Sequence, residues 1–127
     1  MAALDHLLVL TDDIDATRDF WCGALELSVG ERPPLEFPGY WLYDGAAPCV
    51  HVAERVAFEA HSERVGIAAA SGPVEHVAFN ASDYEGLLDR LASGGVAAAE
   101  NTVPGVRQVF LEDPNGVKIE INVKEQS

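Results

Sequence analysis

The chain has 127 residues, of which 48% are apolar and 23% are charged, and its formal net charge at pH 7 is −13. This length predicts one domain with a hydrophobic core of its own. The excess of acidic side chains would repel phosphate backbones and anionic lipid headgroups, so we expect neither a nucleic acid nor a membrane as partner.

The sequence predicts a cytoplasmic location. Its two cysteines, Cys22 and Cys49, are too few for a disulfide framework and lack the spacing of a redox motif. The first residues lack the basic region of a signal peptide, and Asp5 and His6 interrupt any candidate apolar region. No apolar run is long enough to cross a bilayer.

The first half of the chain reads as strand, helix and three strands. Residues 4–11 are apolar and β-prone, with His6 inside the run, and Asp12 and Asp13 then offer helix caps. Apolar residues recur at helical spacing up to about residue 25. Extended segments follow at 27–31, 40–43 and 50–53. The predicted order is therefore βαβββ.

The middle segment, residues 55–73, shows no clear period and ends in Ser71-Gly72-Pro73. This pattern predicts a linker or flap, with a short helical turn at 68–70. We therefore expect a single domain made of module 1 (1–54), this linker (55–73) and module 2 (74–127).

The second half repeats the first. Residues 74–81 predict a strand, Ser82 and Glu85 a helix-capping box, and Gly94-Gly95 the end of that helix. Strands are expected at 96–103 and 106–111, and the turn at 114–116 leads into 117–123, where apolar and polar residues alternate. The predicted fold is α+β, with two βαβββ modules whose mixed sheets curve round a cleft.

The repeat places ligand-type side chains at matching positions. An offset of 70 residues carries His6 onto His76, and an offset of 69 carries His51 onto Glu120. Two imidazoles and one carboxylate suit Fe(II), Mn(II), Ni(II) or Zn(II), so His6, His76 and Glu120 are the predicted ligands of one divalent metal ion. His51 is predicted to be either a fourth ligand or a nearby acid/base.

Three further residues are candidates for contact with a small-molecule substrate. Trp41 and Tyr43 belong to an aromatic group that forms either core or the wall of a pocket, and the sequence leaves both readings open. Asn122 shares a strand face with Glu120.

Three segments carry a family resemblance: the opening LDHLLVL, the central VEHVAF and the closing FLEDPNGVKIEIN. Together they resemble the vicinal oxygen chelate superfamily, which includes glyoxalase I, bleomycin-resistance proteins and extradiol dioxygenases. The resemblance implies that His6, His76 and Glu120 occupy the usual ligand positions and that the chain is a homodimer. It also implies that His51 stands where glyoxalase I has a glutamate that serves as ligand and proton-transfer base.

These observations favour a metal-dependent enzyme of glyoxalase type, an isomerase or lyase with His51 and Glu120 as catalytic residues. A ring-cleaving Fe(II) dioxygenase is the first alternative, provided that His51 stays off the metal and leaves room for O₂. A binder of small molecules without catalysis, of the bleomycin-resistance kind, is the second.

Overall fold

The computed structural model describes residues 4–67 and 74–125. The chain divides into two compact units, Met1–Gly72 and Pro73–Ser127. Each unit contains a four-stranded mixed sheet, and the described residues form an α+β fold as predicted. No helix in the described ranges is long and apolar enough to cross a membrane.

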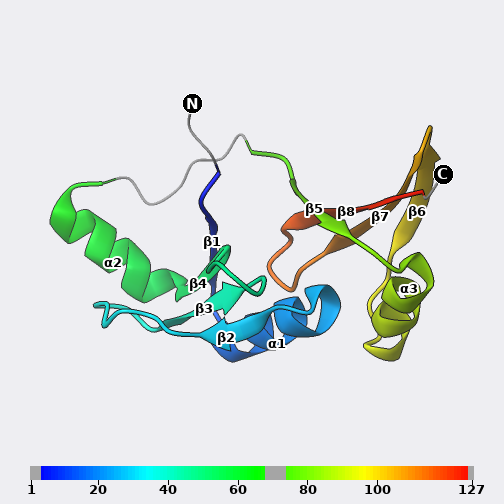
Figure 1. Ribbon diagram of the computed structural model, residues 1–127. Helices are drawn as coiled ribbons and strands as arrows, with labels where there is room; N and C mark the ends of the chain where they lie inside the picture. The colour runs from blue at the N-terminus through cyan, green and yellow to red at the C-terminus, as the bar shows by residue number, and fades with distance from the viewer. Residues whose placement is uncertain (1–3, 68–73, 126–127) are drawn as a thin grey trace. The chain divides into compact units, whose positions relative to one another are not determined.

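The first unit builds its sheet in the order β1-β4-β3-β2, with β1 and β4 parallel and the other neighbours antiparallel. The βαβββ order predicted for this half is confirmed. Its elements are β1 (Leu7–Thr11), α1 (Ile14–Leu25), β2 (Ser28–Gly30), β3 (Gly39–Tyr43), β4 (Val50–Glu54) and α2 (Arg55–Val65) (Figure 1).

Helix α1 covers one face of this sheet, where it contacts β3 and β4. Trp21 of α1 is fully buried, as are Val50 and Val52 of β4. Because side chains alternate across a strand, His51 lies on the opposite face from these two valines. The core thus fixes the direction in which His51 points.

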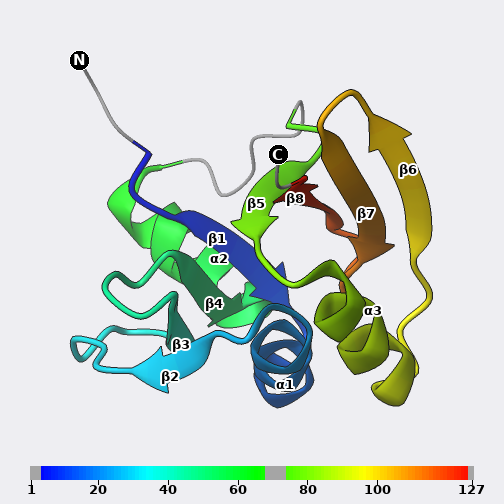
Figure 2. The ribbon, with the colours of Figure 1, turned by 45° about the vertical axis from the view of Figure 1, so that its right-hand side comes forward.

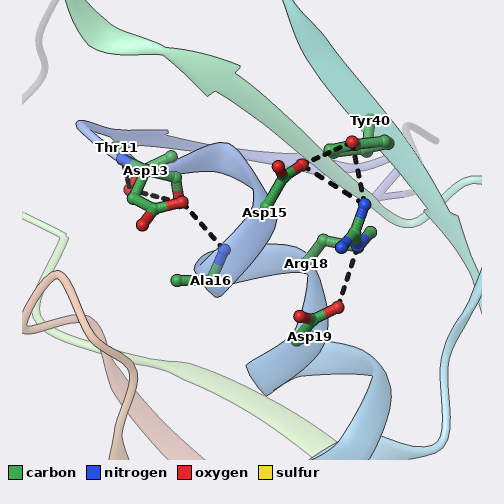
Figure 3. A network of polar contacts seen from close by, with 7 residues as sticks. All are labelled: Thr11, Asp13, Asp15, Ala16, Arg18, Asp19 and Tyr40. Atoms are coloured by element: carbon green, nitrogen blue, oxygen red, sulfur yellow. Dashed lines mark hydrogen bonds and ion pairs between the residues drawn. The ribbon is translucent and has the colours of Figure 1, made fainter.

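A polar network fastens the start of α1 (Figure 3). Asp13 caps the helix by accepting from the backbone N–H of Ala16 at 3.0 Å, as the sequence predicted. The Tyr40 hydroxyl on β3 donates to Asp15 at 2.5 Å and accepts from Arg18 at 2.8 Å. The bond to Asp15 raises the pKa of Tyr40, because it stabilises the protonated phenol. Helix and sheet are therefore joined by polar bonds as well as by the core.

Helix α2 occupies part of the segment predicted to be an irregular linker, so that prediction is wrong for residues 55–65. Good helix formers carry this helix, and of its described residues only Ser62 is buried, which is why no apolar stripe marks it. Gly66 ends it with φ 75° and donates to the Glu63 carbonyl at 3.2 Å. The turn predicted at 68–70 lies outside the described residues.

The second unit has the same strand order, β5-β8-β7-β6, with the outermost pair β5 and β8 parallel. The βαβββ order predicted for this half is confirmed too. Its elements are β5 (Val77–Ala81), α3 (Tyr84–Ser93), β6 (Ala99–Val103), β7 (Val106–Glu112) and β8 (Lys118–Lys124) (Figure 2).

The capping box predicted for α3 is wrong in its first residue. Asp83, not Ser82, is the N-cap, with φ 58°, and its carboxylate accepts from the N–H of Gly86 at 3.1 Å. Aspartate tolerates this left-handed conformation better than most residues. Glu85 does not reach back to close the box but lies 3.8 Å from Arg107.

The turn before β8 forms as the sequence predicted, around Gly116 with φ 84°. Asp113 is buried there and accepts from the backbone N–H groups of Asn115 and Val117 at 2.8 and 2.9 Å. After it, Ile119 and Ile121 are fully buried while Glu120 between them faces the other way. The turn therefore sets which side of the sheet receives the carboxylate.

Candidate functional site

His6 and His76 occupy equivalent places, each immediately before the first strand of its unit. The Nδ1–H of His6 donates to Asp5 at 2.5 Å and that of His76 donates to Glu75 at 2.7 Å. A carboxylate on Nδ1 fixes the orientation of the ring and leaves Nε2 available to a ligand. The side chains of both histidines are about two-fifths exposed, 39% and 40%.

Asp5 and Glu75 were not predicted as site residues. The signal was present, because an acid directly precedes each repeated histidine at the same offset of 70 residues. Lys118 pairs with Glu75, and this bond is the main reason that the pKa of Glu75 is lowered. Glu75 therefore stays ionised beside the His76 ring.

Strand register confirms the repeat within each unit. Leu8 pairs with His51 across the parallel strands β1 and β4, and Ala78 pairs with Glu120 across β5 and β8. Positions 51 and 120 are therefore structurally equivalent, and each lies near the histidine of its own unit. The two units differ in what occupies that position.

In the second unit, the equivalent position carries a carboxylate aimed at the histidine. Glu120 Oε1 lies 3.8 Å from His76 Nε2, and the Glu120 side chain is only 16% exposed. Its other oxygen, Oε2, accepts from the amide of Asn122 at 2.8 Å. The amide N–H of Asn122 thus orients Glu120, and the predicted contact of Asn122 with a substrate stays a prediction.

A row of side-chain amides stands behind Glu120. Gln108 donates to Asn122 at 3.2 Å, and Asn101 donates to Gln108 at 2.8 Å. These three residues lie directly opposite one another on β6, β7 and β8. Every amide in the row donates toward Glu120, so the row holds Oε2 and leaves Oε1 facing His76.

In the first unit, the equivalent position carries an imidazole held between two rings. His51 stacks on Trp41 with centroids 4.1 Å apart and on His6 with centroids 3.8 Å apart, and both pairs are within 12° of parallel. Nε2 of His51 is buried and has no hydrogen-bond partner among the described residues. Burial lowers the pKa of His51, and the charge of His6 lowers it further.

The stacking of His51 on His6 limits which residues can bind the same metal ion. An imidazole nitrogen binds an ion through a lone pair in the plane of the ring, at about 2.0–2.1 Å. One ion cannot lie in the planes of two stacked, nearly parallel rings, so His6 and His51 as placed do not share an ion. The arrangement favours the acid/base role among the two predicted for His51.

The structure brings the predicted residues together as two pairs, His6 with His51 and His76 with Glu120. Across the described ranges, no three His, Cys, Asp or Glu side chains form a group that could hold a metal ion. The predicted site that combines both units stays a prediction. The pair of His76 and Glu120 nevertheless suits a divalent ion, because the imidazole Nε2 and the carboxylate Oε1 face each other.

Trp41 and Tyr43 are half-buried and line an open pocket of about 440 Å³ with Glu31, Arg32 and Pro33. The Tyr43 hydroxyl donates to the backbone carbonyl of Glu31 at 2.6 Å. Of the two readings left open by the sequence, the structure favours the pocket wall. Their contact with a substrate stays a prediction.

Comparison with known proteins identifies the family. The model of the Glyoxalase/Bleomycin resistance protein/Dioxygenase superfamily matches residues 3–121. The chain belongs to this superfamily. No curated protein matches the sequence closely enough to be called a relative.

Solved structures of this superfamily's fold cover nearly the whole chain. Lactoylglutathione lyase from Agrobacterium tumefaciens is 18% identical, with TM-score 0.68, over 97% of this chain and 94% of that one. The antibiotic binding protein TnmS3 from Streptomyces sp. CB03234 is 16% identical, with TM-score 0.71, over 98% of both chains. The oxidase ChaP-H2 is 20% identical, with TM-score 0.66, over 99% of this chain and 96% of that one. At such identities the likeness establishes the fold alone, and the reaction must be argued from the residues.

Proposed function

We propose that this superfamily member is a divalent-metal-dependent enzyme that acts on a small molecule chelated through two adjacent oxygens, in a glyoxalase-like isomerisation or lyase step. His6, His76 and Glu120 would hold the ion, which is Fe, Mn, Ni or Zn. One observation carries the proposal: His76 Nε2 and Glu120 Oε1 face each other while Glu75 and Asn122 hold their opposite sides.

A bound ion would act as a Lewis acid that polarises the substrate's oxygens. The chain's own residues would do the rest. Nε2 of His51 is the atom that would take a proton from the substrate or return it, and the flanking rings of Trp41 and His6 hold it in place. Glu120, fixed by the amide row, would keep one oxygen directed at the ion.

A metal measurement tests this proposal first. The protein is purified without chelator and its metal content is measured by mass spectrometry, together with the shift in melting temperature on adding Ni²⁺ or Zn²⁺. We expect close to one ion per site and a stabilising shift that His76→Ala and Glu120→Ala abolish. His61→Ala is the matched control, because His61 pairs with Glu36 outside the site. Equal metal binding by all of these proteins would refute the proposal.

The chemistry is tested by the loss of deuterium from the carbon beside the carbonyl of an α-hydroxyketone, followed by NMR. We expect exchange in the metal-loaded protein and little in His51→Gln, whose metal content stays normal. A homodimer in the cytoplasm is part of the same proposal, and sedimentation analysis checks the dimer.

The stack also supports a second candidate, a ring-cleaving Fe(II) dioxygenase. With His51 held off the ion, three protein ligands would leave room for a bidentate catechol and O₂. Oxygen uptake on adding catechol to the Fe(II)-loaded protein would favour this function over the isomerase. Binding of small molecules with neither reaction, unchanged in Glu120→Ala, would favour a non-catalytic binder.

A further inference from the structure

Arg32 differs from most arginines of this acidic chain. Ion pairs with carboxylates are formed by Arg18, Arg55, Arg64 and Arg107. Arg32 forms none with any residue that the structure describes, although the chain has 21 acidic side chains. Its guanidinium is partly withdrawn from water, and this desolvation lowers its pKa. A partly desolvated cation without a counter-charge is stabilised by a ligand that supplies one.

The position of Arg32 limits what that ligand can be. Arg32 lines the 440 Å³ pocket together with Trp41 and Tyr43. The Tyr43 hydroxyl is occupied by the Glu31 carbonyl, and the Trp41 ring is stacked on His51. The walls thus offer aromatic surface from Trp41 and Tyr43, and Arg32 supplies a positively charged anchor.

Contacts within the protein use only part of the hydrogen-bonding capacity of the Arg32 guanidinium. One terminal nitrogen donates to the backbone carbonyl of Phe37 at 2.6 Å, and the group lies 5.4 Å from the centroid of the Phe37 ring. Arginine has five N–H donors in a planar fork, so most of them are left for another partner. Glu31 also lines the pocket, but it forms no ion pair with Arg32.

The pocket adjoins the residue that would move the proton. Trp41 forms its wall and covers His51, and the charge of Arg32 reaches the His51 ring. A molecule held in the pocket would therefore lie beside the first unit's part of the proposed site.

We propose that Arg32 receives the anionic group, a carboxylate or phosphate, of a substrate whose flat apolar part lies against Trp41 and Tyr43. That this ligand is a substrate rests on the proposed function, whereas its binding to Arg32 does not. The planar fork of arginine matches the two oxygens of such an anion, and the charge-assisted bonds gain strength from partial removal from water.

Equilibrium binding to the full chain tests this. Benzoate and phenyl phosphate are titrated into metal-free protein, with benzamide as the uncharged counterpart, and Trp41 fluorescence reports binding, since Trp21 is fully buried and supplies a constant background. We expect either anion to bind at least tenfold more tightly than benzamide. Arg32→Ala should weaken the anion about 10-fold or more, and Arg32→Lys should weaken it less.

Arg64→Ala is the matched control, because it removes one positive charge from the same unit and Arg64, which pairs with Glu36, does not line the pocket. It should bind the anions as the unaltered protein does. Circular dichroism checks that each variant is folded, and Arg32→Lys carries the test should Arg32→Ala fail to fold. Anion binding that is absent, equal to that of benzamide or unchanged in the Arg32 variants would overturn the proposal. Because no metal is present, that failure would leave the proposed metal site standing, and loss of the metal site would leave this result intact.

Discussion

The two units present the same scaffold with different chemistry at one position. In both, a histidine precedes the first strand, an acid one residue earlier holds its Nδ1, and a parallel strand brings a second side chain beside it. In the second unit that side chain is Glu120, aimed edge-on at the imidazole. In the first it is His51, stacked face-on.

The difference shows that the repeat keeps the placement of this side chain but not its orientation toward the histidine. A carboxylate can share an ion with an imidazole whose lone pair points at it. A second imidazole in the same place packs face to face with the first when an aromatic ring such as Trp41 backs it. Under the proposed function, the second unit would supply two ligands of the metal ion, and the first would supply one histidine ligand beside the proposed base.

The largest effect should come from removing the carboxylate that distinguishes the second unit. Glu120→Ala should weaken the binding of Ni²⁺ or Zn²⁺ about 100-fold or more, since loss of a direct ligand exceeds the effect of an outer-shell partner. Isothermal titration calorimetry measures this. His51→Ala should weaken it far less, and equal losses in the two variants would end the distinction between the units.

The next largest effect on metal binding should come from altering the acidic residue that precedes the histidine in each unit. Asp5→Asn and Glu75→Gln should each weaken metal binding by about 10-fold, because the ring loses the partner that orients it and raises its basicity. The same calorimetric titration applies, with Glu36→Gln as control. A loss in only one of the two variants would show that only one unit contributes a histidine.

The row of amides that orients Glu120 has no counterpart beside His51 among the described residues. Gln108→Leu should release Asn122 and so weaken metal binding a few-fold. This loss corresponds to one hydrogen bond, which contributes about 1 kcal/mol. Gln108→Glu tests the direction of the row, because it removes the donor and keeps the shape. The absorption spectrum of bound Co²⁺ should change in both variants, and an unchanged spectrum would assign the row to stability alone.

The smallest effect concerns the stacked histidine and pH. Burial lowers the pKa of His51, so the unfolded chain takes up this proton at a higher pH than the folded protein. Stability is therefore lost as the pH falls below about 6.5, the ordinary value for histidine. In His51→Gln, the drop in melting temperature between pH 7 and pH 5 should be smaller. His61→Gln, which alters a histidine paired with the exposed Glu36, should not flatten the profile in this way.

Much of the fold could be predicted from the sequence because it follows from local patterns of residues. The alternation of residues 117–123 predicted β8 and the direction of Glu120, since a strand's period of two leaves no other choice once Ile119 and Ile121 are buried. The offsets that carry His6 onto His76 and His51 onto Glu120 predicted the repeat, which the strand register confirms. Helix α2 was missed because a helix with little buried surface leaves no apolar stripe to read.

What the tertiary structure decided is the orientation of each ring and carboxylate. The sequence placed His51 on the right strand and face, but whether it points an edge or a face at His6 depends on Trp41, which lies opposite it on the neighbouring strand β3. Likewise Asn122 was assigned to the correct face, while its bond to Glu120 depends on the row that begins on β6. Periodicity determines the side of a sheet on which a side chain emerges; the neighbours that strand pairing brings from distant parts of the chain determine where its polar atoms point.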